Sequence, residues 1–108
     1  MKEFQLALAA ARGEIPVDLL LENIQLVNVL SGEIYRENVA VYGGRFVGFG
    51  HYEAKKVIHG DGLYMSPGFI DSHIHFESTM LTLHEFSRVV LPFGTTAVVI
   101  DPHEIANV

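Results

Sequence analysis

The alternation of apolar and polar residues along the chain predicts one short helix followed by a series of strands. The opening residues, MKEFQLALAAARGE, place an apolar patch, Leu6–Ala11, between charged residues, which is typical of an amphipathic helix. GEIP ends this helix, because glycine and proline interrupt helical structure. Residues 18–29, DLLLENIQLVNV, then alternate leucine and β-branched residues with polar ones, and this pattern predicts a strand.

The next stretch predicts a hairpin and two further short strands. Gly43-Gly44 lies between two apolar runs in LSGEIYRENVAVYGGRFVGFG, and paired glycines supply the positive φ angles of a tight hairpin turn. Residues 56–59 and 63–65 are predicted as short strands on either side of a turn at residues 60–62. Together with the first strand, these segments predict a small antiparallel β assembly over the first two-thirds of the chain.

The pattern changes at Phe69 and predicts a strand, a helix and a second strand. Residues 69–75 form a strand-like run, residues 83–91 have helical spacing, and Gly94 ends that helix. TTAVVI, residues 95–100, has the composition of a buried strand. Because polar residues follow both strands, the unit is typical of the opening of a (β/α)8 barrel, of which roughly a quarter would be present.

The junction near Ser66 is the one domain boundary that the pattern indicates. Residues 1–66 are predicted to form an N-terminal helix and β-strands, and residues 67–108 the incomplete start of the barrel. We find neither an internal repeat nor a low-complexity segment. The predicted fold class is therefore mixed β and α/β.

Composition narrows the range of functions. With 49% hydrophobic and 19% charged residues, the chain has the balance of a folded protein. Seven basic against thirteen acidic residues give a net charge of −6, which argues against nucleic acid as a partner. No run approaches the roughly 20 apolar residues of a membrane span, so we expect no membrane insertion. The absence of cysteine fits a reducing, cytoplasmic setting and restricts any metal to nitrogen and oxygen ligands.

PGFIDSHIHFEST, residues 67–79, carries the strongest candidate chemistry. Side chains alternate along a strand, so His73 and His75 point to the same face and could bind one metal ion. Neutral imidazole is a ligand for zinc, iron, nickel, cobalt and manganese. Asp71, two residues earlier on that face, could orient one of these histidines. The alternative is that two of the six histidines lie close by chance, with Asp71 bonded to nearby backbone or to an arginine.

A second polar cluster, DPHEIANV, begins where the second predicted strand ends. Asp101, His103 and Glu104 would therefore lie at the same rim as the histidine pair. The alternative is that Asp101-Pro102 caps a following helix, with Glu104 favoured in its first turn by the helix dipole. Both interpretations can hold together.

These motifs resemble those of the adenine deaminases in the amidohydrolase superfamily. PGFIDSHIHFES is similar to the strand that begins the superfamily's barrel, and GTTAVVIDPHEIANV is similar to the adenine deaminase branch in particular. ENVAVYGGRFVGFG resembles the small β-sandwich that flanks such barrels, so the resemblance extends to nearly the whole chain and implies β-sandwich strands within residues 1–66. FEST departs mildly from the family's aliphatic-Glu-Ser-Ser, at Phe76 and Thr79.

The resemblance implies a metal-dependent hydrolase of purine metabolism that converts adenine and water to hypoxanthine and ammonia. His73 and His75 would be metal ligands, with manganese or iron the first choice of ion and zinc also compatible. Glu77 and Ser78, which the residues alone mark as solvated loop positions, could then face the substrate. Residues that the resemblance places around the ligands or at the active-site rim are Asp71, Glu77, Ser78, Asp101, His103 and Glu104.

Members of this family continue through further barrel strands that supply more ligands. We therefore expect an N-terminal fragment that is inactive alone and needs the rest of the barrel or a homo-oligomer partner. Two alternatives stay open. Another hydrolase of the superfamily, acting on a cyclic amide or as a different deaminase, would share FIDSHIH but not DPHEIAN. A non-catalytic β-rich module could instead bind or assemble through exposed strand edges.

Overall fold

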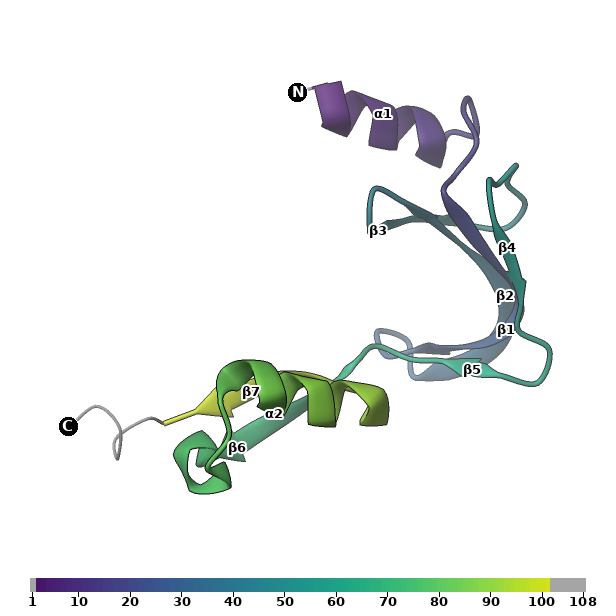
Figure 1. Cartoon of the computed structure of the whole chain (residues 1–108). Coiled ribbons are helices and arrows are strands. Elements are labelled where there is room, and N and C mark those ends of the chain that lie inside the picture. The colour runs from purple at the N-terminus through teal and green to yellow at the C-terminus, as the bar shows by residue number, and fades with distance from the viewer. Residues whose placement is uncertain (1, 102–108) are drawn as a thin grey trace. The chain divides into compact units, whose positions relative to one another are not determined.

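The computed structural model describes residues 2–101 and divides the chain at Ser66 into two compact units (Figure 1). The first unit spans residues 1–66 and the second residues 67–108. No helix within residues 2–101 is long and apolar enough to cross a membrane.

The first unit is a helix followed by a five-stranded sheet. Strands β3, β2, β1 and β4 lie side by side in that order, and β5 also pairs with β1 (Figure 1). The elements are α1 (Lys2–Ala11), β1 (Leu19–Asn28), β2 (Glu33–Tyr42), β3 (Arg45–Phe49), β4 (Val57–His59) and β5 (Tyr64–Met65).

The predicted hairpin is confirmed. Strands β2 and β3 pair antiparallel, with Tyr42 opposite Arg45 at the turn. The turn residues Gly43 and Gly44 have φ angles of 56° and 72°. Glycine adopts this left-handed backbone without the steric penalty that a Cβ atom would bring, which is why two glycines close this turn.

The prediction of an antiparallel assembly is wrong at one edge of the sheet. Strands β1 and β2 are antiparallel, but β4 and β5 both run parallel to β1. After β3 the chain crosses to the far side of β1, and the two strands that it forms there run in the same direction as β1. Alternation of side chains reveals strands but carries no information about strand direction, and the prediction failed for this reason.

A bulge at Asn23 divides β1 into two halves with different partners. Asn23 has a φ of 58°, and its backbone N–H donates to the side-chain Oδ1 of Asn38 at 2.9 Å. Residues 20–22 of β1 pair with β4, whereas Gln25 and Leu26 pair with β5. The extra residue bends the strand, as bulges do, and lets one ten-residue strand carry two short neighbours.

The core of the first unit lies between α1 and the sheet. Its buried side chains are Ala10 of α1, Val17, Leu20 of β1 and Ala40 of β2. The hydroxyl of Tyr52 donates to the carbonyl oxygen of Ala11 at 3.0 Å. Helix α1 is therefore held by apolar packing and by a hydrogen bond from a residue distant in sequence.

The second unit is a parallel pair of strands joined through a helix. Thr82 caps α2, because its Oγ1 accepts a hydrogen bond from the backbone N–H of Glu85 at 3.3 Å. Gly94 ends the connection with a φ of 93°. The elements are β6 (Phe69–Ile74), the 3-10 turn η1 (Phe76–Thr79), α2 (Leu83–Val90), the 3-10 turn η2 (Leu91–Phe93) and β7 (Thr95–Ile100).

Apolar packing in the second unit centres on one aromatic pair. Phe76 of η1 and Phe86 of α2 are each 8% exposed, and their rings meet edge to face with centroids 5.4 Å apart. By contrast, Phe69 and Ile70 of β6 are more than 60% exposed. Parallel sheets are normally covered on both faces, so this unit presents an apolar surface that a larger parallel sheet would bury. Its place in an eight-stranded barrel stays a prediction.

Candidate functional site

The two candidate histidines lie together at the end of β6. His73 belongs to the strand, and His75 follows its last residue and precedes η1. Their imidazole rings are in contact, with centroids 4.9 Å apart and planes at 87°. Because His73 and His75 are two residues apart on nearly extended backbone, both rings lie on the same side, as the alternation of strand side chains predicts. Their role as metal ligands stays a prediction.

Asp71 satisfies the backbone of its own strand. Its Oδ1 accepts a hydrogen bond from the backbone N–H of His73 at 3.1 Å. The pairing of β6 with β7 is irregular between Asp71 and Ile74, so this N–H lies where the regular ladder is interrupted. The arrangement matches the alternative interpretation, in which the carboxylate bonds to nearby backbone.

Glu77 is the buried charged group of this region. Its side chain is only 7% exposed, and its Oε1 lies 3.7 Å from Nδ1 of His75. Neither carboxylate oxygen has a hydrogen-bond partner within the described part of the chain. A buried carboxylate is costly unless a cation or a donor compensates it. The residues alone indicated a solvated loop position, and that interpretation is wrong.

The turn that carries Glu77 is closed by several short hydrogen bonds. The backbone N–H of Ser78 donates to the carbonyl of His75 at 3.2 Å, and Thr79 Oγ1 donates to the carbonyl of Phe76 at 2.7 Å. Ser78 itself is exposed, as the residues alone indicated. Phe76 and Thr79 had stood out only as departures from a family motif, yet they anchor this turn. The sequence signal that could have identified Phe76 was a large apolar residue among polar ones, shortly before an amphipathic helix.

The second cluster begins at the same end of the parallel sheet. Ile74 of β6 is the register partner of Ile100 of β7. His75 and Asp101 each follow these partners by one residue, so the two clusters start at neighbouring strand ends, which in parallel α/β folds is where ligands bind. Asp101 is exposed. His103 and Glu104 lie outside the described residues.

The donor set suits a divalent metal but is not complete in this region. Within residues 2–101, no group of three or more histidine, aspartate or glutamate side chains converges as metal ligands would. Two adjoining imidazoles and a buried carboxylate without hydrogen bonds are nevertheless the nitrogen and oxygen chemistry that manganese, iron and zinc accept. The residues present therefore fit part of a metal site, and further ligands would have to come from elsewhere.

A concave region lies in the first unit, between α1 and the β2–β3 hairpin. It has a volume of about 350 Å³. Neither histidine nor any pair of carboxylates lines it, so it offers no comparable chemistry. Its lining residues are Glu3, Phe4, Ala7, Tyr42, Gly43 and Arg45.

Comparison with known sequences gives consistent matches. Residues 64–108 match the amidohydrolase family. The chain is 56% identical over 99 residues to an adenine deaminase of Kosmotoga olearia, a match that covers 91% of this chain and 17% of the relative. It is 50% identical over 101 residues to an adenine deaminase of Desulfatibacillum aliphaticivorans, covering 94% of this chain and 18% of that protein. The chain thus spans less than a fifth of the length of these relatives.

Solved structures of amidohydrolases superpose on this chain. A D-aminoacylase with a binuclear metal centre superposes with a TM-score of 0.67 and 28% identity, over 79% of this chain and 18% of that one. An N-acyl-D-glutamate deacylase of Bordetella bronchiseptica, complexed with zinc, superposes with a TM-score of 0.66 and 22% identity, over 80% of this chain and 19% of that one. The mixed sheet and helix arrangement is therefore that of amidohydrolase structures.

Proposed function

We propose, from the chain's place in the amidohydrolase family, that it serves the hydrolytic deamination of adenine. In this reaction the C6–N bond of adenine is broken and a C6–O bond is formed with water, giving hypoxanthine and ammonia. The observation that carries the proposal is identity of 45–56% to adenine deaminases of several organisms, over 91–100% of this chain. The matches that cover 100% of this chain span both strand-end motifs.

His73 and His75 would hold the divalent metal of this reaction. Their rings are in contact at the end of β6, which contains His73 and directly precedes His75. When bound, such an ion supplies a water of lowered pKa and polarises the atom under attack. Manganese or iron is the proposed ion, and zinc is also compatible with imidazole and carboxylate ligands. The binuclear metal centre of the related D-aminoacylase supports a bound metal, without choosing among these ions.

The remaining candidates would line the same rim. Ser78 is exposed on η1, and Asp101 follows β7 at the neighbouring strand end, which supports a position near substrate for both. His103 and Glu104 complete the proposed rim from sequence alone. Asp71 would keep the backbone of His73 in place through its hydrogen bond. A cytoplasmic location belongs to the proposal and is supported by the absence of cysteine.

Amide hydrolysis is the second candidate function. The D-aminoacylase structures are 28% identical to this chain, so they support a hydrolase whose substrate carries an acyl-amide bond. Both reactions attack an sp² carbon with activated water, and the strand-end histidines serve either one. The far higher identity to adenine deaminases favours deamination.

The choice between deamination and amide hydrolysis is tested with the natural protein, meaning the protein as it occurs in the cell and not the 108 residues alone. It is incubated with adenine and with manganese, iron or zinc. We expect hypoxanthine and ammonia in equal amounts, at a rate proportional to protein and abolished by a chelator. N-acyl-D-amino acids, supplied in a parallel assay, should remain intact. Hydrolysis of the acyl substrate with adenine unchanged would reject deamination in favour of the second candidate.

A further inference from the structure

We infer that Glu77 is a positioning residue whose buried carboxylate holds the Nδ1–H of His75 and so leaves Nε2 of His75 to bind the metal. The inference rests on the proposed metal site and assigns a specific task to one acidic residue beside it. Histidine ligands commonly donate the second ring N–H to a carboxylate or carbonyl, which fixes the tautomer and the ring orientation.

Burial makes Glu77 the unusual carboxylate of the second unit. Its side chain is 7% exposed, whereas that of Glu85 on α2 is 47% exposed and pairs with Arg88. No lysine or arginine within residues 2–101 forms an ion pair with Glu77, and its oxygens accept no hydrogen bond there. Nδ1 of His75 lies 3.7 Å from Oε1 of Glu77. This separation exceeds a hydrogen bond, so the inferred bond requires the two atoms to move closer together by about half an ångström or more.

The backbone around Glu77 is held firmly enough for a positioning role. The turn η1 is closed by the hydrogen bond from the Met80 N–H to the Glu77 carbonyl at 3.1 Å. Phe76, the preceding residue, is buried against Phe86 of α2. The carboxylate therefore projects from a turn that is fixed to the helix, rather than from a loose loop. A side chain on such a support loses little freedom when it orients a neighbour.

Other polar groups near the histidines are less suited to this task. Asp71 accepts a hydrogen bond from the backbone of His73, and its side chain is exposed. Ser78 is exposed, and its backbone N–H is bonded to the carbonyl of His75. Glu77 alone among these three combines burial with proximity to an imidazole nitrogen.

The tautomer of His75 in the unmutated natural protein tests the inference directly. We would record the 15N chemical shifts of its two ring nitrogens in chelator-treated protein at a pH where the imidazole is neutral. We expect the proton on Nδ1 and a bare Nε2. A proton on Nε2 would overturn the inference, and this measurement needs no variant to fold.

Variants of Glu77 give a second readout that does not depend on catalysis. Glu77→Leu removes the acceptor and should weaken manganese or zinc binding about 10- to 100-fold, while Glu77→Gln keeps one accepting oxygen and should restore part of the affinity. Glu85→Gln, an exposed change on α2, is the matched control and should bind metal as the unmutated protein does. Competition with a fluorescent chelator measures these affinities, and circular dichroism checks folding.

The outcomes separate this inference from the proposed function. If Glu77→Leu binds metal within about twofold of the unmutated protein, Glu77 does not position the ligand. If metal affinity falls as expected but the natural protein leaves adenine unchanged, the positioning role stands and deamination is rejected. If the natural protein deaminates adenine but His75 carries its proton on Nε2, deamination stands and the positioning role of Glu77 is rejected.

Discussion

At Gly68, in the motif PGFIDSHIHFEST, packing leaves room for no residue larger than glycine. A Cβ atom built on Gly68 would collide with the Oγ1, Cγ2 and Cβ atoms of Thr96 on β7. The glycine therefore permits the close approach at the start of the β6–β7 pair, independent of any chemistry. We expect Gly68→Ala to lower the free energy of unfolding by about 1–3 kcal/mol, the usual cost of overpacking.

Denaturant unfolding of the natural protein measures this effect. Ser66→Ala, an exposed change two residues away, is the control and should alter stability by less than about 0.5 kcal/mol. If Gly68→Ala were as stable as Ser66→Ala, β6 and β7 would have to accommodate the added Cβ atom without loss of stability, and close packing would not explain the glycine.

Asp18 carries an ion pair with a defined pH dependence. Its Oδ1 lies 2.6 Å from Nζ of Lys55, and its Oδ2 accepts from the Gly43 N–H at 2.8 Å. The hydrogen bond from Lys55, followed by that from Gly43, lowers the pKa of Asp18 below its ordinary value of 3.8. A lowered folded-state pKa stabilises the fold above pH 3.8, and this stabilisation is lost as the pH falls through the lowered value.

Asp18→Asn should therefore destabilise the first unit at neutral pH but not in acid. The difference in urea midpoint between the variant and the unmutated protein should shrink once the pH falls below 3.8. Added salt should reduce it at neutral pH, since both side chains are exposed. A difference that stays constant with pH would exclude the ion pair as its cause.

At the scale of elements, sequence patterns gave the segments but not their neighbours. The helix α1, the β2–β3 hairpin and the strands flanking α2 all follow from local periodicity and glycine positions. The parallel edge of the first sheet did not, because the side of β1 to which the chain returns after β3, and the direction in which it runs there, leave no mark in local periodicity. Likewise, no local pattern reports that the side chain of Glu77 is only 7% exposed, because burial depends on contacts between residues distant in sequence.

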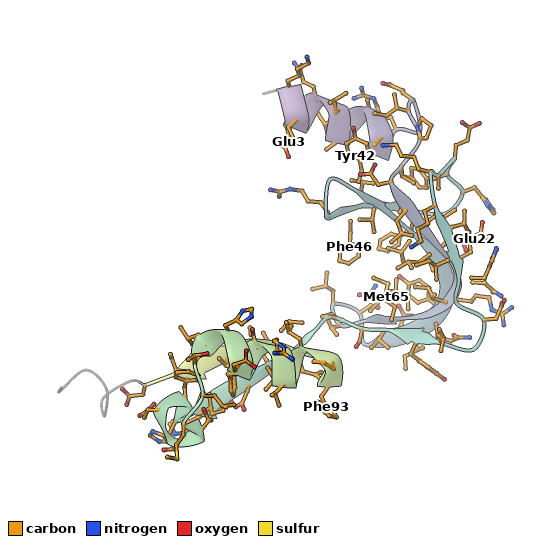
Figure 2. The ribbon with its side chains drawn as sticks, in the orientation of Figure 1. Glu3, Glu22, Tyr42, Phe46, Met65 and Phe93 are labelled. Carbon is orange, nitrogen blue, oxygen red and sulfur yellow. The ribbon has the colours of Figure 1, made fainter. Side chains whose placement is uncertain are left out.

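Phe86 should hold the turn η1 against α2. Replacing Phe86 by alanine removes the edge-to-face contact with Phe76 and leaves a cavity, which typically costs about 3–5 kcal/mol for a buried aromatic residue. Amide hydrogen exchange in residues 76–79 should accelerate as the turn loosens. Phe93, which is 80% exposed and projects away from the ribbon (Figure 2), provides the control. Similar exchange in both variants would show that the aromatic pair does not support η1.

At the scale of the whole molecule, the exposed apolar side chains indicate that the 108 residues need further protein surface to cover them. Side chains of the second unit that are more than half exposed include Phe69, Ile70, Phe93 and Val99. A two-stranded parallel sheet buries too little on its own to be stable. We expect the 108-residue chain, produced alone, to associate or to unfold without a sharp transition and to leave adenine unchanged.

Size-exclusion chromatography and thermal unfolding of that chain check this expectation. A monomer with cooperative unfolding and no deaminase activity would favour the alternative of a self-standing β-rich binding module. Adenine turnover by the purified chain would mean that the two strand-end clusters suffice, or that chains assemble a site between them.

The most direct test asks whether the strand-end histidine holds the metal for deamination. Bound manganese or iron and adenine turnover should be measured together in the natural protein, in His75→Ala and in His84→Ala, an exposed histidine of α2. Removing the hydrogen-bond partner of a metal ligand typically lowers metal affinity or activity about 10- to 100-fold, and removing the ligand itself should have a larger effect. His75→Ala should therefore lower both metal affinity and kcat/KM by more than about 100-fold. His84→Ala should change neither. Full turnover with bound metal in His75→Ala would contradict the assignment of this site.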